Sequence, residues 1–89
     1  MLPKMGESIG FFVAIEDGDE KIGVYWSGTV IAHVHCETVR VADCRGDIWL
    51  VIWDFELAQY VGIPDVTWYY SCGRAIPRMH GFLQSAVIH

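Results

Sequence analysis

The stretch Ile-Trp-Leu-Val-Ile-Trp, residues 48–53, decides the fold. Its six consecutive apolar residues are rich in the β-branched and aromatic side chains that favour strands, and an aspartate lies on each side. The stretch therefore predicts a central strand. Alternation places Ile48, Leu50 and Ile52 on one face and the other three residues on the opposite face, so neither face suits water. We expect both faces to be covered and Leu50 to be closely packed.

The chain before this stretch predicts a β-hairpin. Ser8 to Ile15 alternates in the two-residue period of a strand with one strongly apolar face. Glu16 to Glu20 contains the Asp-Gly pair that is favoured in tight hairpin turns, and Lys21 to Trp26 is predicted to return as the second strand.

A third strand is expected after a break at Ser27-Gly28. Thr29 to Val41 is mostly apolar at alternate positions, but the apolar phase changes sides within it. One inserted residue would restore the register, so we expect a bulge or sharp bend near Cys36 to Thr38. Residues 43–47 then predict the turn into the central strand.

Beyond the central strand the pattern predicts a helix and a further strand. Asp54 is a suitable N-cap and Gly62 a suitable C-terminal residue, so Phe55 to Val61 is predicted to be a two-turn helix. Val66 to Ser71, with its aromatic residues, is predicted to be a strand. Residues 77–88 fit either a helix or a closing strand.

These elements indicate an α+β fold. We expect a mainly antiparallel, strongly bent β-sheet of five or six strands with one short helix near residues 55–61, an arrangement that could close into a small barrel. The 89 residues, 53% of them hydrophobic, are enough for one core, so residues 1–89 are expected to form a single domain.

Composition restricts the cellular setting and the partner. Three cysteines without a Cys-x-x-Cys pair argue for a reducing compartment, and we expect a cytoplasmic protein without a membrane span. The net charge is −5, with six scattered basic residues, so direct nucleic-acid binding is not expected.

The most specific arrangement of polar residues is His33-x-His35-x-Glu37. On a regular strand these side chains would share one face and could bind zinc or iron. The same pattern is equally that of a solvent-exposed strand face. We expect no metal and no cofactor, and keep these three residues as the alternative metal site.

Catalytic motifs are not evident. Cys36 follows His35 directly, and neighbours on a strand point to opposite faces, which is the wrong geometry for a thiolate and its base. There is no glycine-rich phosphate loop and no nucleophile elbow in the sequence. We therefore expect a protein that is not an enzyme.

Four tryptophans and four tyrosines are many large amphipathic side chains for one small core. Such side chains are enriched at protein interfaces because their polar tips tolerate partial exposure. We expect an exposed aromatic patch with an acidic rim supplied by the first hairpin. The expected patch consists of Tyr25, Trp26, Trp68 and Tyr70, and the expected rim of Glu16, Asp17, Asp19 and Glu20.

These observations predict a small non-enzymatic interaction module that acts by stoichiometric binding to a protein or ribonucleoprotein, or as a homodimer. Compact acidic proteins of this kind include inhibitors that phages and mobile elements direct against host enzymes or defence complexes. The alternative is a small-ligand or metal-binding β-barrel that uses His33, His35 and Glu37.

Overall fold

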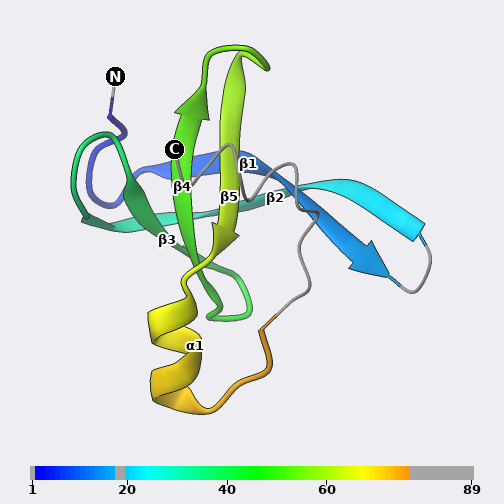
Figure 1. Cartoon of the computed structure of the whole chain (residues 1–89). Coiled ribbons are helices and arrows are strands. Elements are labelled where there is room, and N and C mark those ends of the chain that lie inside the picture. The colour runs from blue at the N-terminus through cyan, green and yellow to red at the C-terminus, as the bar shows by residue number, and fades with distance from the viewer. Residues whose placement is uncertain (1, 18–19, 77–89) are drawn as a thin grey trace.

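A computed structural model describes residues 2–17 and 20–76 of the chain. The described residues form a closed five-stranded barrel followed by one short helix (Figure 1). The fold is thus mostly β, and the small barrel considered from the sequence is confirmed. The elements are β1 (Ser8–Asp17), β2 (Glu20–His33), β3 (Val39–Asp43), β4 (Ile48–Asp54), β5 (Gln59–Pro64) and α1 (Val66–Cys72).

The barrel is closed by one parallel strand pair. Each strand pairs antiparallel with the next along the chain, and β1 also pairs with β5 in parallel, where Phe12 lies opposite Val61. In a meander of five strands the first and the fifth run in the same direction, so the pair that closes the barrel must be parallel. The sheet is therefore mixed and not purely antiparallel.

Side chains fill the barrel interior. The buried cluster takes alternate residues from β1, β3 and β4 and one residue, Val30, from β2, because side chains in a strand point alternately inward and outward. The most deeply buried members are Phe11, Val13, Val30, Val39, Val41, Trp49 and Val51.

The predicted central strand is confirmed, since β4 pairs with both β3 and β5. Trp49 and Val51 point into the core, whereas Leu50 and Ile52 lie on the outer face and are half-buried. The expectation that Leu50 is closely packed in the core is therefore wrong. Both alternating faces of the stretch are apolar, and only closure of the barrel decides which one is inside.

The helix predicted for Phe55 to Val61 is absent. Asp54 Oδ1 accepts hydrogen bonds from the amides of Glu56 and Leu57, as an N-cap would, at 2.9 and 3.0 Å. The chain then turns back at Ala58, which has a φ of 53°, and continues as β5. The capping interaction that the sequence suggested is thus used to close a hairpin turn.

The strand predicted for Val66 to Ser71 is also wrong, because this segment forms α1. Asp65 caps the helix through a 3.3 Å hydrogen bond from the amide of Trp68 to its Oδ1. Gly73 ends the helix in the left-handed conformation, with a φ of 71°. These two end signals outweigh the weak strand preference of the aromatic residues between them.

Strand β2 passes through the break predicted at Ser27-Gly28 and ends at His33. A Cβ atom at Gly28 would lie 2.5 Å from the carbonyl oxygen of Ala42, so this glycine permits close approach of β3 and does not mark a turn. Residues 29–33 thus belong to β2, and the predicted third strand begins only at Val39. The bend expected near Cys36 is present as a turn in which Cys36 has a φ of 54°.

The predicted hairpin between the first two strands is confirmed, with Asp17 opposite Glu20. Residues 18–19 at its tip, and the ambiguous segment 77–88, lie outside the described residues.

Candidate functional site

Helix α1 follows β5 directly and is fixed to the barrel by polar ties at both of its ends. At the first end, the Asp65 amide donates to the carbonyl oxygen of Ile48 at 3.0 Å. The buried Asp65 carboxylate also accepts a 2.7 Å hydrogen bond from Nε of Arg40 on β3. The helix start is thereby attached to two different strands.

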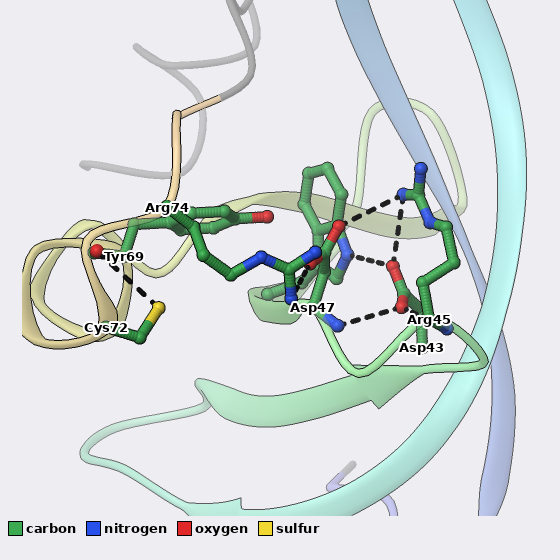
Figure 2. A network of polar contacts seen from close by, with 7 residues as sticks. Asp43, Arg45, Asp47, Tyr69, Cys72 and Arg74 are labelled. Atoms are coloured by element: carbon green, nitrogen blue, oxygen red, sulfur yellow. Dashed lines mark hydrogen bonds and ion pairs between the residues drawn. The ribbon is translucent and has the colours of Figure 1, made fainter.

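The turn between β3 and β4 supplies the ties at the second end. Its buried Asp43 carboxylate accepts hydrogen bonds from the Asp47 amide at 3.0 Å, the Arg45 amide at 2.9 Å and Trp49 Nε1 at 2.9 Å (Figure 2). Arg45 Nη2 is a fourth donor, 3.3 Å from Oδ2, and together these donors satisfy a carboxylate that burial would otherwise make unfavourable. Asp43 therefore holds the turn in one conformation.

Asp47 joins this turn to the C-terminal end of α1. Its carboxylate lies between two guanidinium groups, with Arg45 Nη2 at 3.4 Å from Oδ2 and Arg74 Nη1 at 2.7 Å from Oδ1 (Figure 2). The Arg74–Asp47 contact lacks regular hydrogen-bond geometry, so we describe it as an ion pair. Arg74 comes immediately after Gly73, and its ion pair therefore fixes the end of the helix.

Each of these arginines also covers a tryptophan. Cζ of Arg45 lies 3.8 Å from the ring centroid of Trp26, and Cζ of Arg74 lies 5.5 Å from that of Trp68. Both distances fall within the range of cation–π attraction. Arginine and aspartate side chains thus connect two tryptophans that are far apart in the sequence. We call Asp43, Arg45, Asp47 and Arg74 the Arg–Asp network.

Tyr69 of α1 is buried, and its ring points toward the Arg–Asp network (Figure 2). Its hydroxyl has no hydrogen-bond partner among the described residues. Burial, followed by the negative charges of Asp47 and Asp43, raises the pKa of Tyr69 to about 12. The phenol is therefore neutral at physiological pH, where it acts neither as a base nor as a nucleophile.

Two large apolar side chains of α1 are exposed, beside the exposed polar residues Thr67 and Ser71. Val66 and Tyr70 lie one turn apart on the same side of the helix and are 42% and 77% exposed. Two neighbouring large apolar side chains that are this exposed are available for contact with a partner. We call Val66 and Tyr70 the α1 surface.

The four predicted aromatic residues do not form one patch. Tyr25 is 65% exposed on β2 and packs edge-on against Phe12, with ring centroids 5.6 Å apart. Trp26 is half-buried and packs against the core, so it does not lie outside the core as expected. Trp68 and Tyr70 lie on α1, not on a strand.

The expected acidic rim does not border α1 either. The β1–β2 hairpin projects from the barrel on a different side from α1 (Figure 1). Tyr25 is the one predicted aromatic residue on that hairpin whose ring is well exposed. Glu16, Asp17 and Glu20 belong to the hairpin strands, and Asp19 lies outside the described residues.

The alternative metal site is not assembled on a strand face. His33 is the last residue of β2, whereas His35 and Glu37 lie in the turn that follows. His33 Nε2 is 2.7 Å from the carbonyl oxygen of Pro3, to which it donates a hydrogen bond. Within residues 2–17 and 20–76 no three histidine, cysteine, aspartate or glutamate side chains are grouped as metal ligands.

Sequence patterns indicate Tyr70 of the α1 surface but miss Val66 and the Arg–Asp network. Asp43, Arg45 and Asp47 alternate in a short turn, which was a visible signal, but Gly73-Arg74 stood isolated in the sequence. The aromatic residues around Val66 favour a strand, in which Val66 and Tyr70 would not be neighbours, whereas α1 places them one turn apart.

In comparisons with known proteins, no family model, no curated protein and no solved structure matches this chain. Among the described residues, no helix is long and apolar enough to cross a membrane. The function is therefore inferred from the surface of the molecule itself.

Proposed function

We propose that this protein is a small, non-enzymatic, cytoplasmic interaction module that binds a protein or ribonucleoprotein partner stoichiometrically through the α1 surface. The observation that carries the proposal is the 77% exposure of Tyr70 on a helix tied to the barrel at both ends. A tyrosine held in this way buries a large area on binding and loses little side-chain entropy.

The Arg–Asp network supports a role in binding and not in catalysis. The Asp43 carboxylate accepts hydrogen bonds from the turn and from Trp49 on β4, and Asp47 forms ion pairs with two arginines. Tyr69 is neutral at physiological pH. These groups hold α1 in place, and rigid presentation reduces the entropy that binding must overcome.

We extend the proposal to the kind of protein and partner. A net charge of −5 and 89 residues are typical of small inhibitors that phages and mobile elements direct against host enzymes or defence complexes. A homodimer that uses the same α1 surface is a variant of this proposal. Sedimentation of the purified protein distinguishes a monomer from a dimer.

The test compares two exposed tyrosines that lie on different sides of the barrel. A photo-crosslinking amino acid is placed at Tyr70 or at Tyr25, and complexes are recovered from native host cells. Tyr70→Ala should then weaken binding of the recovered partner by ~2 kcal/mol, mainly through faster dissociation. Tyr25→Ala is the matched control and should leave the affinity unchanged.

The opposite pattern would contradict the proposed surface. If Tyr25→Ala weakens binding and Tyr70→Ala does not, the interface lies on the β1–β2 hairpin. If neither position yields a crosslinked partner, or if neither alanine variant weakens binding of a partner that is recovered, the interaction function itself fails.

A further inference from the structure

Two tryptophans of this protein hold a guanidinium group between an indole face and a carboxylate. Arg45 lies over Trp26 and Arg74 lies over Trp68, and both arginines are also paired with Asp47. The combination is favourable because the ring and the carboxylate both attract the cation. At the turn between β4 and β5 a third tryptophan, Trp53, lines a hollow together with the carboxylate residues Asp54 and Glu56.

Trp53, at the end of β4, is half-buried and packs edge-on against Tyr60, with ring centroids 5.0 Å apart. Beside it lies an open hollow of about 280 Å³, lined by Ile52, Trp53, Asp54, Phe55 and Glu56. Phe55 lies at the edge of this hollow, and its side chain is 76% exposed. We call this hollow the Trp53 recess.

The Trp53 recess is negatively charged, and no lysine or arginine lies near its residues in the sequence. No lysine or arginine occurs in residues 46–73, whereas Asp54 and Glu56 line the recess itself. Asp54 uses Oδ1 to hold the turn. Within the described residues, neither carboxylate forms an ion pair, and no arginine or lysine lies over the Trp53 ring.

We propose that the Trp53 recess binds an arginine side chain of a protein partner. The guanidinium would lie against the Trp53 ring and pair with Asp54 Oδ2 and Glu56, as Arg45 does with Trp26 and Asp47 within the chain. Phe55 would cover the aliphatic part of the arginine. The β4–β5 turn and α1 lie at opposite ends of the barrel (Figure 1), so this site is independent of the α1 surface.

The experiment is an NMR titration of the ¹⁵N-labelled full-length protein with the capped tripeptide Gly-Arg-Gly. Amides of residues 52–57 and the Trp53 indole N–H should shift in a saturable manner. The same tripeptide with citrulline, which has the shape of arginine without its charge, should bind at least about tenfold more weakly.

Charge-neutralising variants test the same site from the protein side. Asp54→Asn retains the side-chain oxygen that holds the turn, and Glu56→Gln retains the side-chain length. The double variant should bind Gly-Arg-Gly about tenfold more weakly, since it loses both charge pairs. Glu37→Gln removes one charge in the exposed β2–β3 turn and is the matched control for Glu56→Gln alone; it should bind Gly-Arg-Gly as the unmodified protein does.

Three results would overturn the proposal. The citrulline peptide could bind as tightly as Gly-Arg-Gly. The double variant could bind Gly-Arg-Gly as tightly as the unmodified protein does. The chemical-shift changes could be centred on a part of the molecule other than residues 52–57. A well-dispersed spectrum establishes that the double variant is folded, and Glu56→Gln alone replaces it if that spectrum collapses. Loss of partner binding in Tyr70→Ala concerns the α1 surface and does not affect this outcome.

Discussion

At the scale of single residues, the Tyr69 hydroxyl is a buried polar group beside the Arg–Asp network that lacks a hydrogen-bond partner among the described residues. It lies beside two aspartates. Asp43 contrasts with it, because four donors satisfy its carboxylate. An unpaired buried hydroxyl stabilises nothing by itself, so its removal should be tolerated.

Tyr69→Phe should therefore change the free energy of unfolding at neutral pH by no more than ~1 kcal/mol. Burial and the nearby carboxylates raise the pKa of Tyr69 from its ordinary 10.0 to about 12 in the folded protein. The folded protein thus favours the protonated phenol more than the unfolded chain does. The free energy of unfolding therefore has its full value below about pH 10 and falls as the pH rises toward 12.

Urea unfolding across this alkaline range measures the effect. The unmodified protein should lose stability with pH more steeply than Tyr69→Phe does. Parallel slopes for the two proteins would show that Tyr69 ionises as it does in the unfolded chain.

At the scale of elements, α1 is too short to be stable alone. It has seven residues, and isolated helices below about 12 residues are marginal in water. Its stability therefore depends on its cap and its ties to the barrel. Asp65 provides both, since Oδ1 caps the Trp68 amide and Oδ2 pairs with Arg40.

Asp65→Ala should cost ~2 kcal/mol of stability, because it removes a cap and leaves Arg40 without its partner. Asp65→Asn keeps an oxygen for the cap and should cost only about half as much. Urea unfolding monitored by far-ultraviolet circular dichroism compares the two variants. A cost for Asp65→Asn equal to that for Asp65→Ala would mean that the cap contributes nothing.

At the scale of the whole molecule, closure of the barrel assigns an inside and an outside to every strand. The stretch in β4 is apolar on both faces, yet Trp49 and Val51 are buried while Leu50 and Ile52 are half-buried. The parallel contact between β1 and β5, at Phe12 and Val61, produces this assignment by completing the ring of strands.

Val51→Ala should therefore destabilise the protein more than Leu50→Ala, although leucine loses more atoms. We expect ~2 kcal/mol for Val51, which leaves a cavity in the packed interior, and ~1 kcal/mol for Leu50, whose outer position water can fill. Thermal or urea unfolding of the two variants checks this order. A larger cost for Leu50→Ala would place the outer face of β4 in a second core.

Local patterns in the sequence predicted what depends on neighbours along the chain. The two-residue period of Ser8 to Ile15, the hairpin after it, the turn at residues 43–47 and the central strand are all present. The expected aromatic exposure holds at Tyr25 and Tyr70. In each case the side-chain period or the turn chemistry acts within a few residues, so no distant contact was needed to infer it.

Tertiary contacts helped to decide the states of residues 55–61, predicted to be a helix, and 66–71, predicted to be a strand: residues 59–61 belong to β5, and residues 66–71 belong to α1, where the local caps Asp65 and Gly73 also act. Both segments mix apolar and aromatic residues with weak local preferences, so the state is set by what each must contact. Val61 must pair with β1 to complete the barrel, and Arg74 must reach Asp47 from the end of a helix. Such contacts join residues far apart in the chain, and their free energies exceed the small propensity differences that a local pattern reflects.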